Sequence, residues 1–192
     1  MGRERPILFS GDMVRAILDG RKSVTRRVVK PQPAAGVRKS VFVPSGLEDG
    51  HGKEIRPRYF PGDRLWVRET WAPRGEYKAT PWAGATGKAK WTPSIHMPRW
   101  ASRITLEVTG VRVERVQDIT EDGAKAEGFS ADPRCKVGFN FPRPHQARDA
   151  FAGTWIDLYG EESWNKNPWV WVVEFKKLEG QTPSLLEEKN DR

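Results

Sequence analysis

The chain has 192 residues, a formal net charge of +8 and a single cysteine, Cys135. This length fits one domain with a sizeable buried core, and one cysteine excludes a disulfide framework and a cysteine-based zinc site. No apolar run approaches the ~20 residues that span a bilayer, and the N-terminus has no apolar signal core. We therefore expect a cytoplasmic protein with no membrane partner.

The positive charge is concentrated near the start of the chain. Residues 1–40 hold ten Lys or Arg residues against three Asp or Glu. Such a local excess favours an anionic partner, and nucleic acid is the commonest partner of a basic domain. A solvated basic face is the alternative interpretation. The histidines His51, His96 and His145 stand singly, without the spacing of a helical metal site, so we expect neither a metal nor a cofactor.

The first predicted elements lead into one chemically dense segment. Residues 6–9 suit a buried strand, and residues 13–18 carry the apolar i,i+4 stripe of a helix that Gly20 ends in a left-handed conformation. Residues 24–29 read as a strand that stops before Pro31. Between helix and strand, residues 20–27 (GRKSVTRR) hold four cations and two hydroxyls.

This segment suits two kinds of chemistry. Arginine binds phosphate through two parallel hydrogen bonds, and lysine acts as a point charge. Alternatively, like charges and partial burial lower the pKa of a lysine, so that its neutral amine can take a proton from a neighbouring hydroxyl. We take Arg21, Arg26 and Arg27 as candidates for contacts to substrate or nucleic acid.

The rest of the chain alternates between elements and long loops. Insertions rich in Pro and Gly are expected near 31–58, 72–100 and 130–145, the first with room for a small hairpin. Strands are predicted over 65–71, 104–116 and 168–175, and helices over 120–127 and 146–159. Thr120 is the predicted N-cap of the helix whose last turn contains Glu127. We expect a single domain over 1–179 and a polar tail over 180–192.

Aromatic and charged residues around the second insertion supply further binding candidates. Most of the nine tryptophans should be core or loop anchors, but a tryptophan can also stack on an exposed base. We include Glu69, Trp71 and Arg99 as candidates for contacts to substrate or nucleic acid. As a strand carboxylate, Glu69 is more often a partner for arginine than a catalytic acid. The bent strand over 104–116 suits a small barrel in an α+β fold.

Taken in order, these motifs resemble the ASCH domain, a branch of the PUA-like barrels. The resemblance rests on Gly20-x-Lys22-x-x-x-x-Arg27, on residues 61–67 (PGDRLWV), on 119–121 (ITE) and on 169–175 (WVWVVEF). The longer form, with its Trp-rich insertions, is similar to ASCH proteins of phages and prophages. The resemblance to the ASCH domain implies a small, mostly antiparallel PUA-like β-barrel with flanking helices, and a role at RNA, DNA or a modified nucleoside.

The resemblance extends to the small ASCH amidohydrolases that deacetylate N4-acetylcytidine. It implies Lys22 as proton acceptor, Thr25 as nucleophile and Glu127 as donor of a proton to the leaving nitrogen. Those enzymes lack the three insertions, and they have an apolar residue where this chain has Arg26. A larger basic cleft would suit a polynucleotide. A non-catalytic module that recognises a modified RNA or DNA base, and a metal-independent ribonuclease, are therefore the alternatives.

Overall fold

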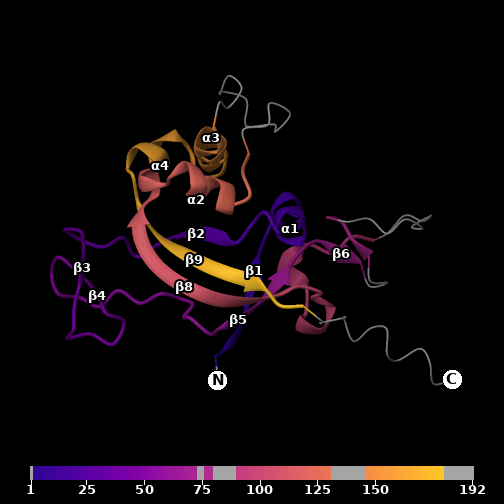
Figure 1. Ribbon diagram of the computed structural model, residues 1–192, viewed down its shortest axis with the longest axis horizontal. Coiled ribbons are helices and arrows are strands. Elements are labelled where there is room, and N and C mark those ends of the chain that lie inside the picture. The colour runs from indigo at the N-terminus through magenta and orange to yellow at the C-terminus, as the bar shows by residue number, and fades with distance from the viewer. Residues whose placement is uncertain (1, 73–75, 80–89, 131–145, 180–192) are drawn as a thin grey trace. The chain divides into compact units, whose positions relative to one another are not determined.

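A computed structural model describes residues 2–72, 76–79, 90–130 and 146–179 (Figure 1). Its strands are β1 (Glu4–Leu8), β2 (Val24–Val28), β3 (Val37–Lys39), β4 (Leu47–Asp49), β5 (Arg64–Arg68), β6 (Trp71–Ala72), β7 (Glu76–Tyr77), β8 (Thr105–Arg115) and β9 (Trp169–Lys177). Its α-helices are α1 (Gly11–Leu18), α2 (Glu121–Ala126), α3 (Ala147–Tyr159) and α4 (Glu161–Asn165). Short 3-10 helices occur at η1 (Ser94–His96), η2 (Arg99–Ala101) and η3 (Val116–Asp118).

The fold is α+β, as the sequence predicts, and its main sheet is mostly antiparallel. Five strands hydrogen-bond in the order β1-β5-β8-β9-β2. β2 is antiparallel to β9 and β5 is antiparallel to β8, whereas β1 and β5 are parallel. The described strands do not close into the predicted barrel, because the order begins at β1 and ends at β2 with no pairing between these two.

Contacts between residues divide the chain into two compact units. The first unit contains residues 1–23, 61–109 and 175–192, and the second contains residues 24–60 and 110–174. The division falls inside β8 and inside β9, so neither unit is a continuous stretch of chain. The single domain over 1–179 stays a prediction.

In the first unit, α1 and the strands β1 and β5 supply an apolar core. Its buried side chains include Ile7, Val14, Ile17, Leu65 and Val67. The helix ends where the sequence predicts, because Gly20 has a φ of 73°, which glycine adopts without a steric penalty. The chain then turns back, and the backbone N–H of Lys22 donates to the carbonyl of Ala16 at 3.0 Å.

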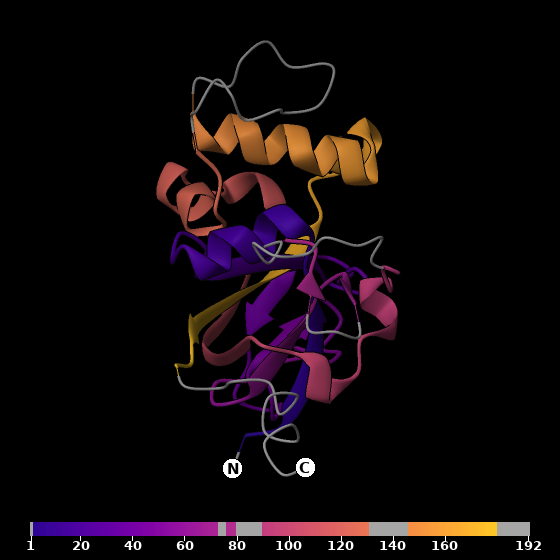
Figure 2. The same cartoon turned by 90° about the vertical axis from the view of Figure 1, so that its right-hand side faces the viewer.

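In the second unit, the helices α2, α3 and α4 gather over β2 and β9 (Figures 1 and 2). Their shared core contains Val24, Val116, Ile119, Ala124, Ala147, Phe151, Trp155, Val170 and Val172. The helices predicted over 120–127 and 146–159 are present as α2 and α3. Thr120 is the N-cap of α2, as predicted, and its hydroxyl oxygen accepts a hydrogen bond from the backbone N–H of Gly123 at 3.0 Å.

Two of the predicted insertions are described at least in part. Residues 31–58 contain the β3–β4 hairpin, at whose tip Val41 and Phe42 are 92% and 90% exposed. The described part of 72–100 contains β7 and η1, and Met97 is fully buried there. Residues 131–145 and the predicted tail 180–192 lie outside the described residues. Within the described part of the chain, no helix has both the length and the apolarity to cross a bilayer.

A carboxylate joins α2 to α3 in the second unit. The Oε1 and Oε2 atoms of Glu121 accept hydrogen bonds from the backbone N–H groups of Ala147 and Arg148 at 3.0 and 3.1 Å. These bonds lower the pKa of Glu121, because they stabilise its ionised form. The stabilisation is present above the ordinary glutamate pKa of about 4.3 and is lost as the pH falls below it.

We therefore expect Glu121→Ala to lower the melting temperature at pH 7 by a few degrees, because two N–H groups at the start of α3 lose their acceptor. Differential scanning calorimetry would measure the change. The difference between wild type and variant should shrink at pH 3. Glu162→Ala is the matched control, since it removes a solvent-exposed pair with Lys166. Equal melting of wild type and Glu121→Ala at pH 7 would contradict the proposed role of this carboxylate.

Candidate functional site

The three residues predicted to be catalytic are all buried. Lys22, Thr25 and Glu127 each have 4% of their surface exposed. Lys22 belongs to the first unit, whereas Thr25 and Glu127 belong to the second. Polar side chains of these types are mostly exposed in folded proteins. Their burial makes these positions unusual, and it requires that the surrounding protein replace the water they have lost.

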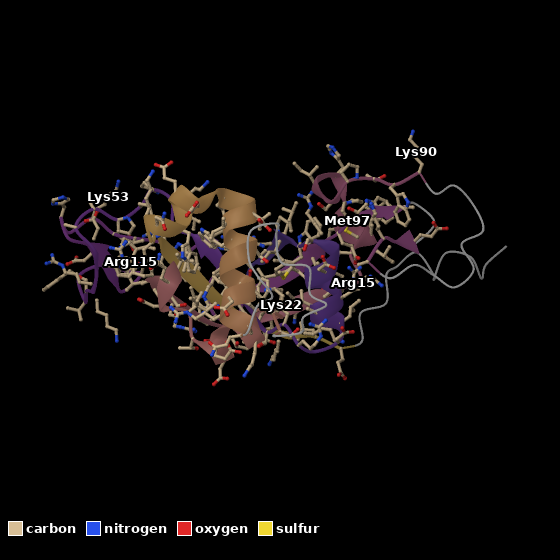
Figure 3. All side chains as sticks on the ribbon, turned by 90° about the horizontal axis from the view of Figure 1, so that it is seen from above. Arg15, Lys22, Lys53, Lys90, Met97 and Arg115 are labelled. Carbon is tan, nitrogen blue, oxygen red and sulfur yellow. The ribbon has the colours of Figure 1, made fainter. Side chains whose placement is uncertain are left out.

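Lys22 lies in the turn that follows α1 (labelled in Figure 3). Its Nζ atom is 5.5 Å from the ring centroid of Phe9, which is also buried. Apolar surroundings disfavour a charged ammonium group, whereas the face of an aromatic ring favours it. Within the first unit, Lys22 is therefore a shielded amine next to an aromatic ring.

Thr25 lies in β2, opposite Val173 of β9. Successive side chains of a strand point to opposite faces of the sheet. Thr25 and Arg27 consequently share one face, as the sequence predicts, and Arg26 points to the other. Arg27 is half-buried, whereas Arg26 is buried.

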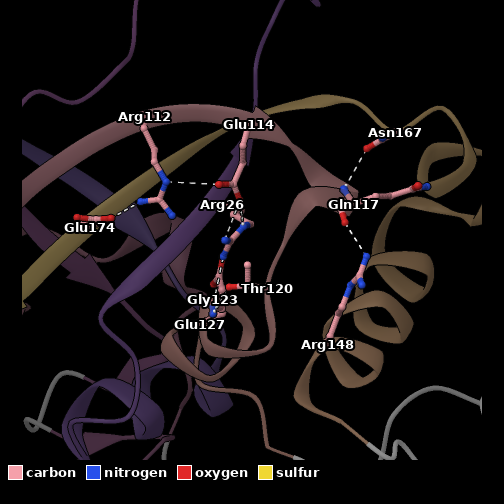
Figure 4. Close-up of polar contacts among 10 residues, drawn as sticks. All are labelled: Arg26, Arg112, Glu114, Gln117, Thr120, Gly123, Glu127, Arg148, Asn167 and Glu174. Atoms are coloured by element: carbon pink, nitrogen blue, oxygen red, sulfur yellow. Dashed lines mark hydrogen bonds and ion pairs between the residues drawn. The ribbon is translucent and has the colours of Figure 1, made fainter.

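Arg26 is the centre of a buried ion cluster in the second unit (Figure 4). The Nε and Nη2 atoms of its guanidinium lie 2.9 and 2.8 Å from Oε1 of Glu114. Its Nη1 atom lies 3.4 Å from Oε1 of Glu127 and donates to the carbonyl of Gly123 at the same distance. Only 2% of the Arg26 side chain is exposed, so these partners replace the water that the charge has lost.

The local sequence of α2 explains how Glu127 reaches this cluster. Thr120 begins the helix and Glu127 is its C-cap residue, followed by Gly128 with a φ of 94°. At Gly123, a Cβ atom would come within 3.0 Å of Nη2 of Arg26. Glycine at this position therefore lets the guanidinium approach the backbone of α2 closely.

The cluster continues towards the surface as a series of alternating charges. Nε of Arg112 lies 3.4 Å from Oε2 of Glu114, and its guanidinium also pairs with Glu174 (Figure 4). The Arg112 and Glu174 side chains are a little under half exposed, whereas Arg26 and Glu127 are almost fully buried. The sequence motifs did not point to Glu114 or Arg112. Both lie on β8, far along the chain from β2, and no local motif marks them.

A separate ion pair occupies the first unit. Glu69, a predicted binding residue, accepts two hydrogen bonds from Arg103, at 2.8 and 3.0 Å. The Arg103 guanidinium lies 4.0 Å from the ring centroid of Tyr77, and burial raises the pKa of the Tyr77 hydroxyl. The sequence favoured an arginine as the partner of Glu69, and such a pairing is present, although Glu69 lies just beyond the end of β5 and not within a strand as predicted. The sequence did not identify Arg103 as the partner.

The other predicted binding residues also have partners within the protein. Trp71 is buried and packs edge-to-face on Trp100 at a centroid distance of 5.3 Å. Nη2 of Arg99 lies 2.7 Å from Oε1 of Glu4. Nη2 of Arg21 lies 2.9 Å from Oδ2 of Asp19, and both side chains are largely exposed. For all of these residues, contact with a substrate or nucleic acid stays a prediction.

Possible metal ligands are sparse in the described chain. No three His, Cys, Asp or Glu side chains are grouped there as a metal site requires. His145 and Cys135 lie outside the described residues.

Comparison with known proteins gives two distant structural matches. No protein-family model and no curated protein matches the chain. A crystal structure of an ASCH domain from Lactobacillus crispatus JV V101 aligns with 91% of this chain and 79% of its own, at 14% identity and a TM-score of 0.42. A crystal structure of hypothetical protein PH0355 aligns with 91% of this chain and 99% of its own, at 12% identity and a TM-score of 0.41. Neither match assigns a role to a residue of this chain.

The ion cluster predicts a large effect of removing its cation. Arg26→Met leaves the buried carboxylate of Glu127 without this guanidinium, so we expect the free energy of unfolding to fall by about 3–5 kcal/mol. Urea denaturation monitored by tryptophan fluorescence would measure the loss. Arg112→Ala is the matched control, because its side chain is 48% exposed, and exposed pairs contribute only about 0–1 kcal/mol. Equal effects of the two substitutions would show that Arg26 has no special role.

Proposed function

We propose that this chain is an ASCH protein directed at nucleic acid or modified nucleosides, and that it hydrolyses the amide of an N4-acetylcytidine-like base. The observation that carries the proposal is the burial of an amine, a hydroxyl and a carboxyl group at the three positions to which the sequence motifs give catalytic roles, Lys22, Thr25 and Glu127. The contact between Arg26 and Glu127 holds the carboxyl group beside β2, the strand that also carries Thr25, although the Arg26 and Thr25 side chains leave opposite faces of that strand.

In the first step, the Thr25 hydroxyl attacks the acetyl carbonyl carbon while the Lys22 amine takes the hydroxyl proton. The bond between the carbonyl carbon and N4 then breaks, and Glu127 gives a proton to N4, which leaves as the amino group of cytidine. Because Arg26 contacts Oε1 of Glu127, we assign the transferred proton to Oε2, and the ionised carboxylate that pairs with Arg26 is the form that remains after the transfer.

In the second step, water attacks the acetyl ester on Thr25 and gives one proton to the Glu127 carboxylate. The Lys22 ammonium returns its proton to the Thr25 oxygen as the ester bond breaks, and acetic acid leaves and ionises to acetate. One water molecule is consumed, and the threonine hydroxyl is restored. The two steps together convert the acetylated base and water into cytidine and acetate, without a change of oxidation state.

The proposal predicts that purified protein releases cytidine from N4-acetylcytidine, as followed by ultraviolet absorbance. Thr25→Val and Glu127→Gln should each lower kcat/KM by roughly 100-fold or more, the usual contribution of a nucleophile or a proton donor. Thr154→Val is the matched control, because its hydroxyl bonds the carbonyl of Ala150 within α3. Activity unchanged in Thr25→Val would contradict the assigned nucleophile.

Two other experimental results would each indicate a different function in place of the proposed hydrolase activity. Salt-sensitive binding of an oligonucleotide without release of cytidine would indicate a non-catalytic module that recognises a modified base. Cleavage of RNA in the presence of a chelator, lost in Lys22→Met, would indicate a metal-independent ribonuclease.

A further inference from the structure

A pocket lies in the second unit, within the insertion near 31–58. It has a volume of about 420 Å³ and is formed by residues 29–34 and 49–56. This volume is in the range of sites that hold small ligands, roughly 300–1,000 Å³. Its walls combine the apolar side chains Pro31, Pro33 and Ile55 with ionisable groups. A ligand that fits it should therefore have an apolar face and a charge.

The two acidic groups of the pocket are already held by the protein. Oδ1 of Asp49 accepts hydrogen bonds from the backbone N–H groups of His51 and Lys53 at 3.0 and 2.9 Å. Glu54 accepts one from the backbone N–H of Ser45, at 3.0 Å, and pairs with Arg56 at 2.7 Å. Both carboxylates thus have their partners within the hairpin segment. The hydrogen bond from the backbone N–H of Lys53 is the main cause of the lowered pKa of Asp49.

The lysines of the pocket are placed differently. Lys30 and Lys53, the latter labelled in Figure 3, are both exposed. Neither ammonium group forms a hydrogen bond or an ion pair with another described residue. Two cations beside apolar walls match a nucleotide, whose phosphate carries the charge and whose base carries the apolar face.

The exposed tip of the hairpin favours nucleic acid over other anions. Phe42 is 90% exposed, and the neighbouring Arg38 and Lys39 are also exposed. Aromatic side chains beside cations are the usual means of binding single-stranded nucleic acid, because every base can stack on a ring. A phosphopeptide or a free phosphate would make no use of such a ring.

The strand β2 connects this pocket to the proposed catalytic site. Its pairing with β9 continues beyond Val28, since the backbone N–H of Val29 donates to the carbonyl of Trp169 at 3.0 Å. From Thr25 to Val29 the extended chain covers roughly 13 Å, at about 3.3 Å per residue. A single nucleoside does not span this distance, whereas a strand with several phosphates does.

We propose that the pocket formed by residues 29–34 and 49–56 binds a nucleotide of a single-stranded polynucleotide, with Lys30 and Lys53 contacting its phosphate. On the basis of the proposed function, we further infer that the chain acts on an acetylated cytosine within a polynucleotide and prefers it to the free nucleoside.

Fluorescence anisotropy with a labelled single-stranded oligonucleotide tests the pocket without requiring turnover. In the variant Lys30→Ala/Lys53→Ala we expect at least tenfold weaker binding and a less steep salt dependence, by about 0.7 per lost phosphate contact. The control is Lys166→Ala/Lys177→Ala, which removes the same charge from exposed positions outside the pocket. Both variants should melt at the wild-type temperature, because the four lysines are exposed.

Equal affinity of the two double variants would overturn the inference, as would competition by polyphosphate as strong as that by an oligonucleotide of equal charge. The experiments distinguish a wrong pocket assignment from a wrong hydrolase proposal. If the protein hydrolyses free N4-acetylcytidine and the pocket variant neither weakens oligonucleotide binding nor slows turnover on an acetylated oligonucleotide, only the pocket assignment is wrong. If no cytidine is released but the pocket variant binds weakly, the pocket stands and the hydrolase is wrong.

Discussion

The buried guanidinium of Arg26 is the constraint on which the candidate site depends. A charge that is 2% exposed needs close partners, and here Glu114 and Glu127 supply them from β8 and from the end of α2. Because Arg26 contacts both carboxylates, its removal would take a close cation from each of them, and the three side chains thus hold these elements together within the second unit. The close approach at Gly123 belongs to the same arrangement.

The strand β2 contributes to both the candidate site and the pocket. Thr25 and Arg26 lie within β2, and residues 29–34, which follow the strand, form one wall of the pocket. A rigid strand is a better support for reacting groups than a loop, because its side chains keep fixed spacing and direction. The insertion near 31–58 could thus extend the recognised part of a substrate without changing the strand that carries the proposed nucleophile.

Local signals in the sequence predicted local structure well. Gly20 ends α1 and Thr120 caps α2 because short-range sterics and hydrogen bonds decide both features. The partners of Arg26 could not be predicted in the same way, since Glu114 is 88 positions away and only the folded sheet brings it close. The prediction of a closed barrel was wrong for the same reason. A strand pattern predicts strands, but the pairing of the first and last strand of a sheet depends on the whole chain.

A double-mutant cycle between Arg26 and Glu127, measured by urea denaturation, examines the contact between these two side chains directly. We expect Arg26→Met to destabilise the protein less in a Glu127→Gln background than in the wild type, by at least about 1 kcal/mol, because residues in one ion network are energetically coupled. Effects of the two substitutions that add within about 0.5 kcal/mol, as for independent sites, would show that Arg26 does not hold the carboxylate of Glu127, and the proposed site would lose its central contact.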